Sequence, residues 1–137
     1  MMSHLDIRAI VLTTLAILGL DFIIGSVVIS VFAGEQVANA TDEQTRKAII
    51  VALAANGAYL RTVLILGTAT TVVGGFMIAR IARSLPYFNA LAFGVVGVLL
   101  NVVPASQVPI WLQVVGVALT IPAALLGAYL ARRPLSK

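Results

Sequence analysis

The run from Thr62 to Arg83 is the feature that most constrains the fold. Its residues are apolar or small almost throughout, and it closes on two arginines. It contains no acidic residue and no proline. About 20 such residues are needed to cross the ~30 Å hydrocarbon core of a bilayer as a helix. The run therefore predicts a transmembrane helix over 62–83.

The overall composition points to a protein built for lipid. Of the 137 residues, 61% are hydrophobic and only 10% are charged, whereas soluble domains carry roughly 25% charged residues. This length suits one membrane domain over 1–137, without a separate soluble module. The net charge is +4, but no basic run with interleaved aromatic residues indicates a nucleic-acid partner. The bilayer is the expected partner.

Three further apolar segments predict spans at about 9–32, 87–103 and 108–130. The first is longer than the ~7–15 apolar residues of a signal peptide and is interrupted by Asp21, so we expect it to be retained as a helix. The connection 84–86 is too short for anything but an antiparallel hairpin. The expected fold is all-α, with four transmembrane helices in an up-down bundle.

A further helix is expected at the membrane surface. The segment 34–41 breaks the apolar pattern, and Thr41-Asp42-Glu43-Gln44 has the form of a capping box with Thr41 as the cap. This predicts an interfacial helix over about 43–56, hinged near Asn56 into the span 62–83. The alternative is one continuous helix that protrudes from the membrane.

The distribution of positive charge predicts the orientation. With both termini in the cytoplasm, six of the nine basic residues lie inside: Arg8, Arg80, Arg83, Arg132, Arg133 and Lys137. Positive residues favour the cytoplasmic side, which predicts a multi-pass protein of the plasma membrane. The other three, Arg46, Lys47 and Arg61, are expected at the outer surface, where they can bind lipid headgroups.

Small residues recur along one face of the span 62–83. Gly67, Thr71, Gly75 and Ala79 follow one another at intervals of four. Such a stripe lets a neighbouring helix backbone approach closely, and close packing holds helices together in lipid. We expect this face to pack against another helix. The alternative is a helix that spans the bilayer and is only incidentally rich in small residues.

Asp21 is the exceptional residue of the first span. It lies about 20 Å along a helix axis from Arg8, close to the middle of the membrane. An ionised carboxylate there costs several kcal/mol, so the group has to be neutral, paired or facing water. The neighbours expected at this depth are Thr70, Thr71 and Thr120. Two interpretations stay open: a proton- or cation-binding site, and an acid hydrogen-bonded purely for packing.

The end of the span 62–83 carries a family resemblance. Gly74-Gly75, followed by Ala79-Arg80, forms a GG-x-x-x-A-R stretch ahead of a short turn and another glycine-bearing span. The chain resembles small four-span bacterial membrane proteins of uncharacterised function over roughly its last 75 residues. The resemblance implies a bacterial inner membrane and a four-span fold, and it implies no activity.

No enzyme chemistry is predicted. The chain has no G-x-S-x-G or H-E-x-x-H motif, no glycine-rich phosphate loop and no carboxylate pair. It has no cysteine and a single histidine, His4, so we expect no metal site and no cofactor. We expect a non-catalytic role as an accessory or scaffolding subunit, or as a homo-oligomeric membrane component. The alternative is a small proton- or cation-coupled transporter that uses Asp21.

Overall fold

The computed structural model describes residues 5–102 and 108–133, and these two ranges contain no strand. The all-α prediction is therefore confirmed for the described part of the chain. The helices are α1 (Ile7–Asn39), α2 (Glu43–Ala54), α3 (Gly57–Ile81), α4 (Pro86–Val102) and α5 (Ile110–Arg132).

Three of these helices, α1, α3 and α5, are long and apolar enough to cross a membrane. The helix α4 is apolar but has 17 residues, and a helix of this length rises about 25 Å. It is therefore somewhat shorter than a ~30 Å hydrocarbon core. The fourth span stays a prediction.

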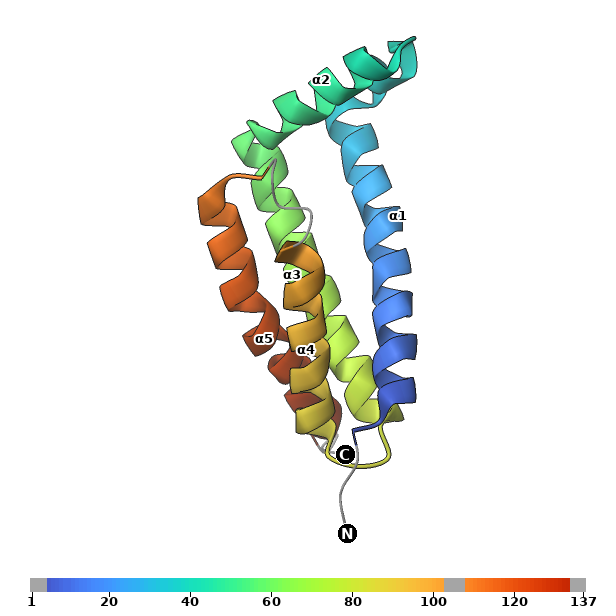
Figure 1. Ribbon diagram of the computed structural model, residues 1–137, viewed down its shortest axis with the longest axis vertical. Coiled ribbons are helices and arrows are strands. Elements are labelled where there is room, and N and C mark those ends of the chain that lie inside the picture. Colours follow the sequence, from blue (N-terminus) through green and yellow to red (C-terminus); the bar gives the residue numbers. More distant parts are fainter. Residues whose placement is uncertain (1–4, 103–107, 134–137) are drawn as a thin grey trace.

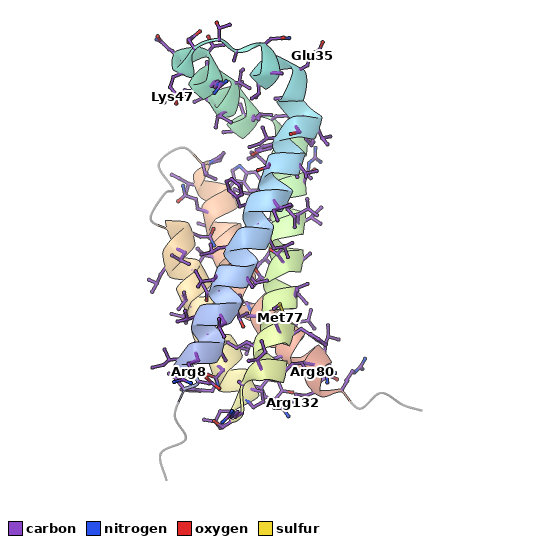
Figure 2. All side chains as sticks on the ribbon, turned by 90° about the vertical axis from the view of Figure 1, so that its right-hand side faces the viewer. Arg8, Glu35, Lys47, Met77, Arg80 and Arg132 are labelled. Carbon is purple, nitrogen blue, oxygen red and sulfur yellow. The ribbon has the colours of Figure 1, made fainter. Side chains whose placement is uncertain are left out.

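The four helices other than α2 lie lengthwise beside one another, and α2 crosses one end of them (Figure 1). The most extensive contact joins α3 to α5, while α4 packs on both of them and α1 packs mainly on α3. We call the end that α2 crosses the α2 end. The opposite end carries Arg8, Arg80 and Arg132, and we call it the arginine end (Figure 2).

The hydrophobic core lies in the half of the molecule nearer the arginine end. It is made mostly of alanine, with Ile17, Ile78 and Phe93 as its large members. Small side chains let the helix backbones approach closely, and such contacts replace the hydrophobic driving force that lipid does not supply. The buried cluster consists of Ala9, Ile17, Ile78, Ala79, Ala82, Ala90, Phe93, Ala124, Ala128 and Ala131.

The first helix differs from its prediction at its C-terminal end. The apolar pattern stops at 34, but α1 continues as a helix to Asn39. The pattern break appears as a kink at Ala33, whose φ of −146° and ψ of 17° are not helical. The helix therefore extends beyond the predicted span 9–32 and includes 34–39 of the segment that breaks the apolar pattern. The loss of apolar residues there changes the direction of the helix without ending it.

The cap of α2 is also displaced from its predicted position. Asp42 is the N-cap residue, and its carboxylate accepts hydrogen bonds of 2.7 Å from both the backbone N–H and the hydroxyl of Thr45. The prediction of Thr41 as the cap is wrong by one residue. A carboxylate is a stronger acceptor than a hydroxyl, which favours Asp42 in this position.

The junction between α2 and α3 is a true break. Asn56 caps α3 by accepting hydrogen bonds from the backbone N–H groups of Ala58 (3.0 Å) and Tyr59 (3.1 Å). Its own backbone is extended, with φ of −84° and ψ of 109°. The hinge interpretation is therefore correct and the continuous-helix alternative is wrong. Because of this cap, α3 begins at Gly57, earlier than the predicted start at Thr62.

Candidate functional site

Asp21 lies at the level where the packing of α1 changes. Toward the arginine end, Thr13 and Ile17 are buried on the same side of α1, with exposed fractions of 0% and 6%. One turn further, the Asp21 side chain is exposed and lines a cavity of about 400 Å³. The carboxyl group therefore stands at the boundary between the close-packed half and the open half of the molecule.

The cavity is bounded by residues from all five helices. Its walls are mostly apolar, including Leu60, Leu64 and Leu112. Its volume falls within the range of ~300–1,000 Å³ that is usual for small-molecule pockets, which are also mainly apolar with a few placed polar groups. The polar groups here belong to Asp21, Tyr59, Thr68, Thr71, Asn101, Gln113 and Thr120.

Close helix contacts occupy the other half of α3 and α5. A Cβ atom at Gly75 would overlap the backbone carbonyl of Ala124, and one at Gly127 would overlap the carbonyl of Val72. At the neighbouring Gly74, a Cβ atom would overlap the ring of Phe93. The cavity therefore lies in the half of the molecule nearer α2. Between the cavity and the arginine end, α3 and α5 pack closely at Gly75 and Gly127.

The predicted small-residue stripe of α3 is divided between these two halves. Gly75 and Ala79 are buried. Gly67 and Thr71 instead line the cavity, and a Cβ atom at Gly67 would meet nothing within 4 Å. The same face of α3 thus packs against a helix over one half of its length and borders open space over the other.

The structure brings the predicted polar neighbours of Asp21 together. Thr71 and Thr120 line the same cavity as Asp21. Thr70 is buried, and its hydroxyl is the side-chain group that interacts electrostatically with the Asp21 carboxyl. That hydroxyl already donates to the Gly67 carbonyl at 2.9 Å, so it offers Asp21 a lone pair. A protonated Asp21 could donate to this oxygen.

Two buried hydroxyls below Asp21 were not predicted as site residues. The Oγ1 atoms of Thr13 and Thr14 are buried and have no hydrogen-bond partner among the described residues. Buried polar atoms normally have a partner, so these two are candidates for contact with water. Thr14 lies two turns before Asp21, about 10 Å along the helix axis. The polar character of this α1 face therefore continues toward the arginine end.

The predicted headgroup-binding residues lie apart from the cavity lining. Arg46 and Lys47 are on α2, and Lys47 pairs with Glu43 at 3.8 Å with both side chains exposed. Arg61 is in the first turns of α3, where its Nε donates to the Gly57 carbonyl at 3.0 Å. All three therefore belong to the α2 end, and their contact with lipid stays a prediction.

The cavity also contains residues that were not predicted to act together. Asn101 and Gln113 come from α4 and α5, and Tyr59 comes from α3, where its ring contacts Phe32 edge to face at 5.7 Å. The only sequence signal for Asn101 and Gln113 was that each is a polar residue inside an apolar segment. Within the described ranges, no group of three or more His, Cys, Asp or Glu residues could hold a metal ion.

Comparisons of the chain with protein-family models, with curated proteins and with solved structures found no match. No relative therefore assigns a role to Asp21 or to the cavity. A role for either has to be inferred from the geometry and chemistry of the cavity itself.

Proposed function

We propose that this protein is a non-catalytic, four-span integral membrane protein that binds a small solute within the membrane, as a proton- or cation-coupled carrier does. The observation that carries the proposal is the position of Asp21 on the wall of the cavity. A carboxyl group that served packing alone would be enclosed by its partners, whereas Asp21 is exposed and lines a cavity of about 400 Å³.

The arrangement of the helices supports the four-span part of the proposal. The helix α4 lies alongside α3 and α5 (Figure 1) and contacts both of them. Its shortness relative to the bilayer can be accommodated by local thinning at modest cost. The up-down order then places both ends of the chain on one side.

The charged residues support the proposed orientation. Arg8, Arg80 and Arg132 gather at the arginine end, while Glu35 and Lys47 lie at the α2 end (Figure 2). Positive charge favours the cytoplasmic side, so the arginine end faces the cytoplasm in this proposal. The cavity then lies in the outer half of the membrane. The bacterial inner membrane is proposed on the resemblance of the GG-x-x-x-A-R stretch.

The lining of the cavity favours a carrier over a purely structural subunit. Among the described residues that line it, none is a lysine or an arginine. An ionised Asp21 would therefore lack a protein counter-ion in the cavity, and an intramembrane carboxylate without one is costly. A proton or a cationic solute supplies the missing charge. This exchange of partners at one carboxyl group is the basis of coupling.

Flux measurements on purified protein in proteoliposomes test the proposal. A trapped pH-sensitive dye would report proton movement under an imposed gradient for the wild type, Asp21→Asn and Asp21→Leu, with melting temperatures measured in parallel. We expect flux in the wild type and its loss in Asp21→Asn with the melting temperature retained. Absence of proton flux in the wild type, or equal flux in Asp21→Asn, would reject a proton-coupled carrier and favour an accessory or scaffolding role.

A further inference from the structure

Three threonine hydroxyls at the level of Asp21, which we call the deep end of the cavity, donate their protons to backbone carbonyls of their own helices. Thr68 donates to the Leu64 carbonyl at 2.7 Å, Thr71 to the Gly67 carbonyl at 2.8 Å, and Thr120 to the Gly116 carbonyl at 2.7 Å. A hydroxyl has one proton to donate and two lone pairs that accept. These three side chains therefore present acceptors to the cavity.

Asp21 adds further acceptors to the same wall. An ionised carboxylate only accepts hydrogen bonds, and its two oxygens offer about four lone-pair positions. The side chains that could donate, those of Tyr59, Asn101 and Gln113, come from the outer turns of their helices and not from the level of Asp21. The deep end of the cavity thus combines one acid with hydroxyl oxygens and lacks a basic side chain among its described residues.

The rest of the wall is apolar. Leu60, Val63 and Leu64 of α3 face the same space as Leu112 and Val117 of α5. A bare metal ion would need several oxygen ligands that converge at about 2–2.6 Å, and the single carboxylate here is a poor basis for such a shell. An acyl chain would fit the apolar walls but would leave the acceptors of the deep end unmatched.

We infer that the cavity binds an organic ammonium ion with an apolar body, whose N–H groups contact Asp21 and the hydroxyl oxygens of Thr71 and Thr120. This inference rests on the proposed function and specifies the class of its solute. The ammonium group supplies a positive charge and several donors where the wall supplies a negative charge and acceptors. The apolar body occupies the space between α3 and α5 toward the α2 end.

Isothermal titration calorimetry on the protein in nanodiscs tests this inference, with empty nanodiscs as the blank. The probes are phenethylamine, its neutral counterpart phenethyl alcohol, and trimethylphenethylammonium, which keeps the charge but has no N–H donor. We expect binding in the order primary amine, then quaternary ammonium, with the alcohol weakest. Equal binding of the amine and the alcohol would show an apolar pocket without charge recognition and would overturn the inference.

Two kinds of variant test which side-chain atoms bind the ammonium group: those that remove the Asp21 carboxylate and those that remove a threonine hydroxyl. Asp21→Asn should weaken phenethylamine binding at least about tenfold, because hydrogen bonds to charged groups are worth about 1.5–3 kcal/mol. Glu35→Gln is the matched control, because it removes an acid of α1 that does not line the cavity, and it should bind like the wild type. Unchanged binding in a folded Asp21→Asn variant would overturn the inference.

Thr71→Val and Thr120→Val provide a second test of the inference, which applies even if Asp21→Asn fails to fold. Each removes one hydroxyl oxygen at similar volume and should weaken the primary amine by about two- to tenfold, with less effect on the quaternary ion. Equal effects on both probes would contradict a role for these oxygens as acceptors. Asp21-dependent amine binding without proton flux would reject the carrier but support this binding site. Asp21-dependent proton flux without amine binding would support the carrier but reject this binding site.

Discussion

The backbone N–H of Asp6 donates a hydrogen bond of 2.9 Å to Oδ1 of Asn89, a residue 83 positions further along the chain. The same Asn89 side chain donates from Nδ2 to the carbonyls of Ser84 (2.8 Å) and Leu85 (3.1 Å), and it is fully buried. One amide therefore joins the start of α1 to the turn between α3 and α4. These hydrogen bonds hold the start of α1 against the α3–α4 turn at the arginine end, whereas the cavity lies toward the α2 end.

Replacement of Asn89 with leucine should destabilise the protein by about 1–3 kcal/mol, because the partly buried N–H of Asp6 would lose its acceptor and the carbonyls of Ser84 and Leu85 would lose this donor. Thermal unfolding in detergent measures the change. Asn101→Leu is the control, because Asn101 is exposed and donates within its own helix, to the Gly97 carbonyl at 2.8 Å. A loss of stability in Asn101→Leu as large as that in Asn89→Leu would contradict the role of Asn89 in holding α1 to the turn between α3 and α4.

The two halves of α3 should respond in opposite ways to an added methyl group. Gly75→Ala would drive a Cβ atom into the carbonyl of Ala124, and such overpacking typically costs about 1–3 kcal/mol. Gly67→Ala adds a methyl group where nothing lies within 4 Å, and alanine is the better helix former by roughly 1 kcal/mol. We expect a lower melting temperature for the first variant and an unchanged or higher one for the second. The same loss in both would place Gly67 in a packed interface.

The turn after α3 contains a residue that glycine should improve. Leu85 has a φ of 45°, the one positive φ among the described non-glycine residues. A left-handed conformation costs an ordinary L-residue roughly 1–2 kcal/mol. Leu85→Gly should therefore raise the melting temperature or leave it unchanged, as the loss of this strain offsets the entropy of glycine. Leu85→Ala keeps the strain and should not stabilise; a stabilised alanine variant would contradict this explanation.

The cap of α2 should weaken in acid. The Thr45 hydroxyl, and secondarily its backbone N–H, hold the pKa of the exposed Asp42 carboxyl below its ordinary value. Because the folded pKa is the lower one, the contribution of this cap to stability is complete above the ordinary carboxyl pKa. It is lost as the pH falls through the folded value. The chemical shift of the Thr45 amide, followed by NMR, measures this change.

Asp42→Asn provides the control for the acid response. Asparagine is an equally good N-cap residue but does not titrate. The Thr45 amide shift should therefore stay constant in this variant over the pH range in which it changes in the wild type. An acid response of the same size in both proteins would assign the change to another group.

Local features were predictable because they depend on neighbouring residues. Length and hydropathy predict α3 and α5, and Asn56-Gly57 predicts the break between α2 and α3. The errors are of the same local kind. The hydroxyl of Thr41 and the carboxylate of Asp42 compete for one cap, and periodicity alone does not distinguish a kink at Ala33 from the end of a helix.

The cavity was not predictable in the same way. Helical periodicity shows that Gly67, Thr71 and Gly75 share a face, but it does not show how far along that face the neighbouring helix stays in contact. That distance depends on contacts remote in sequence, such as the approach of Gly75 to Ala124. For the same reason Asn101 and Gln113 could be recognised as unusual polar residues, but not as parts of one wall.

Thiol labelling tests the central claim, that a cavity reaches from the α2 end to the level of Asp21. The chain has no cysteine, so a single cysteine can be introduced without background. Thr71→Cys places it on the cavity wall, and Ala79→Cys places it two turns away in the buried core. In sealed vesicles with the α2 end outward, a membrane-impermeant methanethiosulfonate should label Thr71→Cys and leave Ala79→Cys unmodified. An unreactive Thr71→Cys, or labelling only from the arginine end, would contradict the account.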